Sequence, residues 1–330
     1  MSEPREAQTP MQFESRVFQL AKDPEHAEEN QDAYRIEAAG RCVAIADGVA
    51  SGIFSRQWAR ILVEAVVADA PDPQNREAFG RWLDARRRTW QDEIDTSALA
   101  WFQKPKLREG AFSTLLWVRL VEAGPDDGPQ AAGCRLQGAA VGDSCLFWVR
   151  DGRTIRSFPL ENAEQLEASP VVVGSVDLGR DELVEFASIC EPCQEGDLLV
   201  LSTDAVAEWV FRREASGSPP CWDDYWNMTE EDWQQEVDSL RSEREMRYDD
   251  ATLVLLRAVR QAATATPEAS PPPLPADGED DWGEKLKHFS EQVVDEVSEQ
   301  VSRGVKRLKH VKESAESALK KYRDKLREDR

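Results

Sequence analysis

Short apolar runs separated by turn residues recur from residue 13 to residue 260, and they restrict the fold of this chain more than any other feature of its sequence. Most of the runs are rich in β-branched and aromatic residues, which is typical of strands. The pairs Gly142-Asp143 and Asp151-Gly152 favour tight hairpin turns, so we expect antiparallel sheets. Strands are predicted at residues 15–21, 41–46, 113–121, 135–141, 144–150, 183–187, 197–202 and 251–258.

Longer segments between these runs have apolar residues at helical spacing, as where Trp58, Leu62 and Ala65 share one face. Because long helices are separated by hairpins, we expect the helices to cover the outside of stacked antiparallel sheets. The residue pattern thus predicts a layered α+β sandwich. Helices are predicted at residues 55–69, 76–94, 205–213 and 230–245.

The composition changes sharply after Arg260. The Pro, Ala and acidic content of residues 261–281 is typical of an extended linker. Residues 282–330 repeat apolar side chains at close to the helical period, which predicts one long amphipathic helix. With residues 1–12 expected to be disordered, the folded domain is predicted to span residues 13–260.

The chain is strongly acidic, with a formal net charge of -22 at pH 7. This charge argues against nucleic acid as a ligand, because phosphate neutralisation requires clustered Lys and Arg. No apolar stretch is long enough to span a membrane, and the N-terminal residues lack the pattern of a signal peptide. A cytoplasmic protein is therefore expected.

The six cysteines are scattered, which favours reduced and mostly buried thiols. The alternative is a redox pair formed by Cys190 and Cys193, which have the CxxC spacing. A second open question concerns Trp222, Tyr225 and Trp226, which could form a peptide-docking surface or pack against the core.

Aspartates stand at the ends of several apolar runs, at Asp32, Asp47, Asp204, Asp249 and Asp250. A carboxylate at the edge of a buried strand is costly to desolvate unless a cation or hydrogen bonds compensate it. In the sequence, no lysine or arginine accompanies the strand ends at Asp47 or Asp204. Because the ligands would be oxygens and the chain has only three histidines, Mg²⁺ or Mn²⁺ is predicted rather than zinc.

Simpler explanations exist for single aspartates. Asp47 could serve only the turn that it forms with Gly48, and Asp204 could be the N-cap of the helix predicted after it. The combination of several such aspartates favours the metal site, with Gly48 allowing close approach of the backbone to a ligand.

At this point the chain resembles a known family. The motifs look like those of the metal-dependent serine/threonine protein phosphatases of type 2C, and most like their bacterial members. The resemblance covers roughly residues 13–258. In order, the motifs are ENQDAY, AIADGVASG, FSTLLWV, GAAVGDSCLFWVR, LLVLSTDAVAEWV and DDATLVLL.

The resemblance implies a four-layer αββα sandwich, in which two antiparallel sheets are flanked by helices, with a two-metal site in a cleft at one end. Asp47 matches the aspartate that bridges both metals, and Gly48 the residue whose carbonyl binds one of them. Asp204 and Asp249 match the aspartates on the other metal, so Asp47, Asp204 and Asp249 are the expected catalytic residues.

Three further aspartates have weaker counterparts in the family. Asp32 matches an aspartate that holds metal-bound water, and Asp143 one that helps to hold a third, weaker metal in many bacterial members. Asp250 stands where the family more often has Asn. The resemblance therefore implies two or three ions of Mg²⁺ or Mn²⁺.

The implied reaction is hydrolysis of phosphoserine or phosphothreonine in a protein substrate by a water that two metals activate. The family usually has an arginine shortly before the first aspartate to hold the substrate phosphate, and this chain lacks it. Arg16 or Lys22 would have to replace it. The alternative is a pseudophosphatase, a phosphoprotein-binding regulatory or scaffold protein that uses its tail to bind a partner.

The predicted tail helix becomes basic towards its C-terminal end and is acidic before that. Its apolar stripe has nothing in its own segment to pack against. Binding to a protein partner or self-association is the first interpretation, and binding to an anionic membrane surface is the second. A solvated, partly helical tail is the third.

Overall fold

The computed structural model describes residues 10–50, 52–72, 75–97, 99, 101, 103–122, 134–167, 170–179 and 186–260. The linker and the amphipathic helix predicted at 261–330 lie outside the described residues.

Two five-stranded antiparallel sheets form the centre of the domain. In spatial order, the first sheet contains β1 (Met11–Leu20), β12 (Ala251–Arg260), β11 (Leu198–Ser202), β7 (Cys145–Arg150) and β8 (Arg153–Phe158). The second sheet contains β10 (Ala187–Pro192), β6 (Cys134–Val141), β5 (Leu115–Glu122), β3 (Cys42–Asp47) and β2 (Asp32–Ile36). A small sheet joins β4 (Phe112–Ser113) to β9 (Val173–Gly174).

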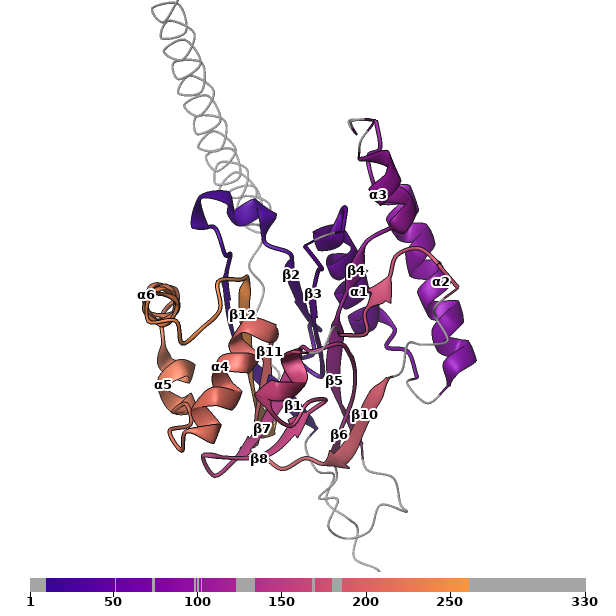
Figure 1. The fold of residues 1–330 in the computed structure, drawn as a ribbon. Helices are drawn as coiled ribbons and strands as arrows, with labels where there is room; N and C mark the ends of the chain where they lie inside the picture. Colours follow the sequence, from indigo (N-terminus) through magenta and orange to yellow (C-terminus); the bar gives the residue numbers. More distant parts are fainter. Residues whose placement is uncertain are drawn as a thin grey trace, which may run out of the picture. The chain divides into compact units, whose positions relative to one another are not determined.

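Helices cover the outer faces of both sheets, as Figure 1 shows. The first sheet is covered by α4 (Asp204–Ala215), α5 (Trp222–Asn227) and α6 (Glu230–Ser242), with the short η3 (Ala163–Glu167) against α4. The second sheet is covered by α1 (Ser55–Ala68) and α2 (Arg76–Glu93), followed by the short α3 (Lys104–Glu109). A 3₁₀ helix, η1 (Pro24–Glu29), connects β1 to β2. The expected four-layer αββα sandwich is confirmed.

Three apolar clusters hold the four layers together. The inner cluster lies between the sheets and includes Ile45, Leu116, Trp148, Leu201 and Val254. The cluster under α4–α6 includes Phe147, Trp209, Val210, Trp233 and Leu255. The cluster under α1 and α2 includes Trp58, Leu62, Leu83, Trp117 and Val141.

Strand β11 shows why the central strands are continuously apolar. All five of its residues are buried, because Leu199 and Leu201 face the inner cluster while Leu198 and Val200 face the helices. A strand covered on both sides cannot alternate apolar and polar residues. Each large side chain buried in this way contributes about 1.5–3 kcal/mol of hydrophobic free energy.

The N-terminal boundary differs from the sequence prediction. Strand β1 begins at Met11, inside the segment 1–12 that was expected to be disordered. The reason is tertiary, since Met11 and Phe13 are buried in the inner cluster and their backbone pairs with Arg260 and Ala258 of β12.

Other differences concern short elements. Most of the strand predicted at 183–187 lies outside the described residues. The observed strand β10 covers Ala187–Pro192, where Ile189 is buried in the inner cluster. β2, α3 and α5 have too few residues to show a clear period, so the pattern did not predict them.

Two open questions from the sequence are answered by burial. Trp222 and Tyr225 are buried in the cluster under α4–α6 and the partly buried Trp226 packs against it, so these residues belong to the core rather than to a docking surface. All six cysteines are free thiols; Cys193 is buried while Cys190 is exposed on β10. Among the described residues, no helix is both long and apolar enough to cross a membrane.

Candidate metal centre

Asp32 and Asp47 stand directly opposite each other at one end of the second sheet. Asp32 begins β2, Asp47 ends β3, and the two residues are paired in register. The backbone N–H of Asp47 donates to Thr114 Oγ1 at 2.9 Å, and Thr114 Oγ1 lies 2.8 Å from Ser144 Oγ. These hydroxyls tie the end of β3 to the turn between β6 and β7.

Asp32 also joins the second sheet to the first. Its Oδ2 accepts hydrogen bonds from Thr203 Oγ1 at 2.9 Å and from Thr252 Oγ1 at 2.7 Å. Its Oδ1 is buried and has no hydrogen-bond partner among the described residues. Burial raises the pKa of Asp32 to about 8, although the two threonine hydrogen bonds oppose this rise.

Asp204 enters the same region from the first sheet, as the first residue of α4 after β11. The N-cap residue is Thr203, so the interpretation of Asp204 as an N-cap is wrong. The Thr203 hydroxyl does not cap the helix, because it donates to Asp32 instead. Burial raises the pKa of Asp204 to about 6, while the positive charge of Arg247 opposes the shift.

Asp249 and Asp250 precede β12 and have different surroundings. Asp249 is half-exposed, and its Oδ1 lies 3.9 Å from Lys22 Nζ. Both oxygens of Asp250 accept backbone N–H groups, from Lys22 at 2.8 Å and from Gln31 at 2.9 Å. Asp250 thus fastens both ends of the loop that leads into Asp32.

Asp143 lies in the turn between β6 and β7, where burial raises its pKa. The preceding Gly142 has φ +99, and a Cβ there would lie 2.6 Å from Thr114 Cγ2. Glycine at this position therefore lets the turn pack against the residue that holds the Asp47 backbone.

Gly48 is required by crowding rather than by a positive φ. A Cβ at Gly48 would lie 2.9 Å from the carbonyl atoms of Ser55 and 3.0 Å from the Gln31 carbonyl oxygen. The Gly48 N–H donates to that same Gln31 oxygen at 3.2 Å. Only glycine lets β3 turn towards α1 this close to the loop before Asp32.

The electrostatics show that the aspartates influence one another. Burial raises the pKa of Asp47 well above its ordinary value. The negative charges of further carboxylates add to this rise: Asp32, Asp204, Asp143 and Asp249. We call these five residues the carboxylate cluster. Within the described ranges, no basic side chain forms an ion pair with Asp32, Asp47 or Asp143.

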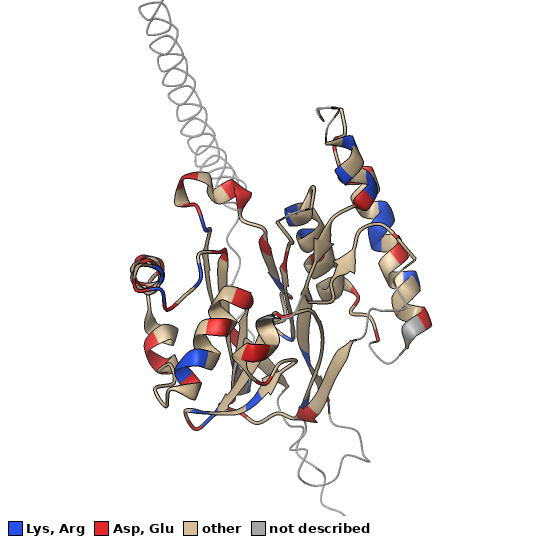
Figure 2. Ribbon diagram, in the orientation of Figure 1, with Lys and Arg blue, Asp and Glu red and all other residues tan. Residues whose placement is uncertain are grey.

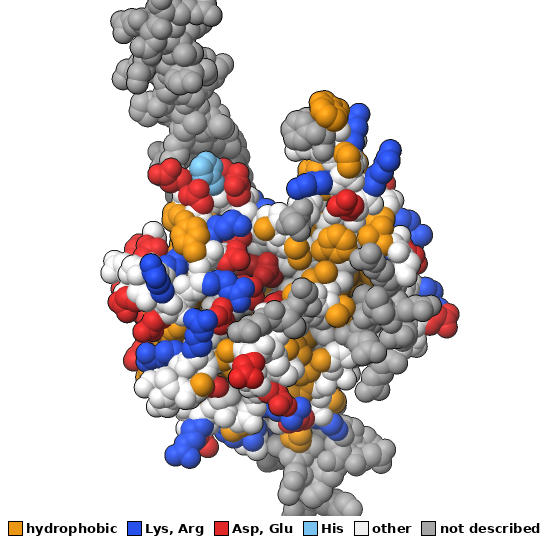
Figure 3. Space-filling view, in the orientation of Figure 1, with side chains coloured by type: hydrophobic (Ala, Val, Ile, Leu, Met, Phe, Trp, Pro, Cys, Tyr) orange, Lys and Arg blue, Asp and Glu red, His pale blue; other side chains and the backbone are white. Residues whose placement is uncertain are grey.

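Figure 3 shows acidic side chains gathered near the centre of one face, with basic side chains beside them on the side of α4 and α6. Buried like charges are costly unless a cation compensates them, so the donor set of the cluster fits a hard divalent ion. In the part of the chain that the structure describes, no three His, Cys, Asp or Glu side chains already form a ligand group for one ion. Carboxylates would have to rotate to bind it.

The structure also corrects the candidate phosphate ligands. Arg16 is exposed in the middle of β1, opposite Leu255, whereas the end of β1 near the cluster is Leu20. Four strand residues span about 13 Å, so Arg16 does not reach the cluster. Lys22, close to Asp249, remains a candidate.

Sequence reasoning missed Arg247 and the threonines. Arg247 Nη1 donates to Asp204 Oδ2 at 2.7 Å, so Asp204 does have a basic partner, contrary to the expectation from its strand end. The partner comes from the loop before Asp249, 43 residues away, and only the fold brings the two together. The signal for Thr203 and Thr252 was their position beside the aspartates in STDA and DDAT.

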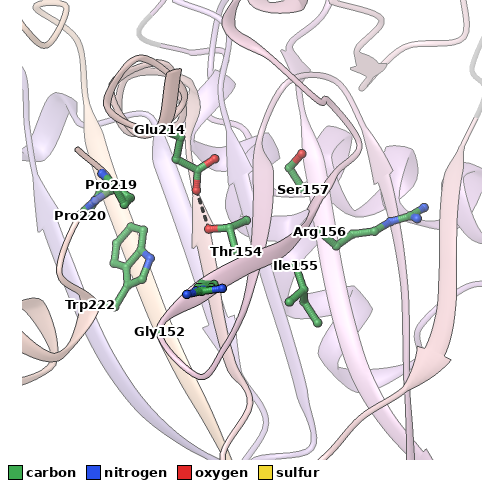
Figure 4. Close-up of a pocket in the computed structure, with 10 residues that line it drawn as sticks. Gly152, Thr154, Ile155, Arg156, Ser157, Glu214, Pro219, Pro220 and Trp222 are labelled. Carbon is green, nitrogen blue, oxygen red and sulfur yellow. Dashed lines mark hydrogen bonds between the residues drawn. The ribbon is translucent and has the colours of Figure 1, made fainter. Parts of the chain in front are cut away.

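Acidic residues also occur on α4, α5 and η1, as Figure 2 shows. A separate groove of about 410 Å³ lies between β8 and the segment from Glu214 to Trp222. Figure 4 shows Thr154 and Glu214 joined there by a hydrogen bond. No member of the carboxylate cluster lines this groove.

A family model described as protein phosphatase 2C matches residues 25–242, which is more than half of the chain. No curated protein matches the chain.

Several solved structures are similar at low sequence identity. PppA, described as a key regulatory component of T6SS in Pseudomonas aeruginosa, is 16% identical, with a TM-score of 0.49, covering 75% of this chain and 98% of that one. The serine/threonine phosphatase Stp1 from Staphylococcus aureus is 14% identical, with a TM-score of 0.48, covering 78% and 99%. The catalytic domain of the phosphatase PstP, in complex with two manganese ions, is 17% identical, with a TM-score of 0.47, covering 76% and 100%.

Proposed function

The chain belongs to the protein phosphatase 2C family, and we propose that it hydrolyses phosphoserine and phosphothreonine in proteins with the help of two Mg²⁺ or Mn²⁺ ions. The observation that carries the proposal is the carboxylate cluster, which draws Asp32 and Asp47 from one sheet and Asp204 and Asp249 from the other. When bound, the two cations lower the pKa of water and neutralise charge on the phosphoryl oxygens.

The ligand roles follow from where each carboxylate lies. Asp47 ends β3 opposite Asp32, and burial together with the charges of carboxylates from both sheets raises its pKa, so we assign Asp47 to both ions. The Gly48 carbonyl adds an oxygen next to it, and Asp204 and Asp249 serve one ion from the side of the first sheet. Asp143, at the β6–β7 turn, is assigned to a third ion.

Asp32 and Asp250 position the site. Two threonine hydroxyls hold Oδ2 of Asp32, which leaves its unpartnered Oδ1 free to accept a hydrogen bond from water. Asp250 already accepts two backbone N–H groups, so we assign it to holding the loop before Asp32 rather than to a metal. Lys22, on the same loop, supplies positive charge for the substrate phosphate.

The test is hydrolysis of p-nitrophenyl phosphate and of phosphothreonine peptides in the presence of Mn²⁺. Asp47→Asn and Asp204→Asn remove a negative ligand each, and we expect turnover to fall by at least about 100-fold, the scale of losing one preorganised charged group. Asp223→Asn is the matched control, because Asp223 is exposed on α5 and lies outside the cluster. Its turnover should equal that of the wild type.

Calorimetry with Mn²⁺ completes the experiment. A wild-type protein that binds Mn²⁺ but hydrolyses neither substrate would contradict the proposed reaction and favour the phosphoprotein-binding alternative. Equal turnover in Asp47→Asn and the wild type would contradict the assignment of the site.

A further inference from the structure

Arg247 links the carboxylate cluster to the next turn of α4. Its Nη1 donates to Asp204 Oδ2 at 2.7 Å and its Nε donates to Glu208 Oε2 at 2.8 Å. Asp204 and Glu208 are four residues apart, so both carboxylates stand on one face of the helix. One guanidinium therefore bridges a member of the cluster and a carboxylate outside it.

The loop that carries Arg247 is held on both sides. Met246 is buried in the cluster under α4–α6, and its N–H donates to the Leu240 carbonyl. On the other side, the Arg241 guanidinium donates to the carbonyl of Asp249. The backbone of this loop is anchored, whereas the Arg247 side chain is 37% exposed, so the guanidinium is open to solvent on one side.

The charge of Arg247 acts on the cluster itself. Burial raises the pKa of both Asp204 and Asp143, and the charge of Arg247 opposes both rises. Two other basic side chains lie near the cluster in the described part of the chain. Lys22 Nζ is 3.9 Å from Asp249 Oδ1, and the Arg241 guanidinium donates to the backbone carbonyl of Asp249. Among the ion pairs of the described residues, Arg247 is the cation in closest contact with a carboxylate of the cluster.

We propose that Arg247 competes with the divalent ion for Asp204 and, once the ion holds that carboxylate, turns the released end of its guanidinium to the phosphate of the substrate. Glu208 keeps Nε in place during the exchange. This inference rests on the proposed function. A guanidinium and a dication repel each other across one carboxylate, and a guanidinium is well suited to two-point contact with phosphate oxygens.

The test compares Arg247→Gln with Arg212→Gln in the full chain. Arg212 also pairs with Glu208 but contacts no member of the cluster, so it controls for loss of a neighbouring arginine. Calorimetry gives the Kd of Mn²⁺, and a second titration of the Mn²⁺-loaded protein gives the Kd of inorganic phosphate. We expect Arg247→Gln to bind Mn²⁺ about two- to fivefold more tightly, the scale of a partly exposed ion pair. It should bind phosphate about tenfold or more weakly, the scale of a lost charged hydrogen bond.

Arg247→Lys provides a second variant that keeps the charge. Its Mn²⁺ affinity should stay close to that of the wild type, because the ammonium still competes for Asp204. Its phosphate affinity should fall, because an ammonium lacks the paired N–H donors of a guanidinium. In kinetics, both variants should raise KM for p-nitrophenyl phosphate more than they lower kcat.

Unchanged or weaker Mn²⁺ binding by Arg247→Gln would contradict the inference that Arg247 competes with the ion for Asp204. Unchanged phosphate binding by this variant would contradict the inference that Arg247 turns to the phosphate. Both constants are measured without turnover. If the wild type hydrolyses no substrate, the proposed function fails, while the inference about Arg247 still stands or falls on the two binding constants.

Discussion

Asp32 shows how single residues in this site depend on distant ones. Its carboxylate belongs to the second sheet, but the hydrogen bonds to it come from Thr203 and Thr252 at the first sheet. The two threonines also bond to each other through the Thr252 N–H and Thr203 Oγ1, at 3.1 Å. Small hydroxyl residues beside the aspartates therefore fix the geometry of the cluster.

Gly48 allows a prediction about the substitution of a single residue. In Gly48→Ala, the new methyl group would meet backbone atoms of Ser55 at 2.9 Å, and backbone cannot move aside as a flexible side chain can. We expect a loss of about 1–3 kcal/mol in the free energy of unfolding, measured by urea denaturation. Gly80→Ala is the control, because nothing lies within 4 Å of a Cβ in this helical position.

The control should be stabilised by about 0.5–1 kcal/mol, the usual gain for alanine over glycine within a helix. A Gly48→Ala protein as stable as the wild type would show that the end of β3 is not as crowded as the structure indicates.

The loop from Lys22 to Gln31 is the element that brings Asp32 to the site. It contains η1, which has no buried residue of its own, so packing does little to hold it. Asp250, just before β12, attaches the loop at both ends, because its two oxygens accept the N–H groups of Lys22 and Gln31. The Arg56 guanidinium and the Gly48 N–H donate further hydrogen bonds to the carbonyls of Glu28 and Gln31.

This attachment predicts a graded response at Asp250. Asp250→Asn keeps one acceptor oxygen, whereas Asp250→Ala keeps none and leaves two N–H groups without a partner. We expect Asp250→Ala to lose about 1–3 kcal/mol of stability and Asp250→Asn to lose less. Hydrogen exchange at Lys22 and Gln31 should speed up in the same order.

Asp177→Ala is a suitable comparison, because the Asp177 carboxylate accepts the N–H of Gly179 within its own exposed turn. Its effect should stay within about 0.5 kcal/mol. Equal exchange rates at Lys22 in Asp250→Ala and the wild type would remove Asp250 from this role.

At the scale of the whole molecule, the carboxylate cluster draws its side chains from both sheets. Asp32 and Asp47 come from one sheet, and Asp204 and Asp249 border the strands of the other. The mutual repulsion of these charges opposes the packing of one sheet on the other. A bound cation would remove that repulsion, so metal binding and folding are expected to be coupled.

Mn²⁺ should therefore raise the thermal midpoint. At a concentration about 100 times the Kd, a ligand that binds only the folded state adds about 2.7 kcal/mol. For a domain of this size that corresponds to an increase of about 5–10 °C. A chelator should reverse the increase, and Asp47→Asn should show little of it. An equal increase in Asp47→Asn would place the stabilising ion elsewhere.

The layers and most long elements could be predicted from the sequence, because periodicity reports burial directly. Residues 198–201 of β11 and 253–256 of β12 are continuously apolar, and α1 has one apolar face, as a strand or helix covered by neighbours requires. Cluster aspartates such as Asp47 and Asp204 were also identified, since a carboxylate at the end of such a run is conspicuous.

Only the tertiary structure decided which groups compensate these aspartates. Arg247 donates to Asp204 from 43 residues away, and Thr252 donates to Asp32 from 220 residues away. Asp250 accepts the Lys22 N–H from 228 residues away. The start of β1 at Met11 was decided in the same way, by pairing with Arg260. Local pattern reports which residues are buried, whereas the identity of a partner depends on how the chain closes on itself.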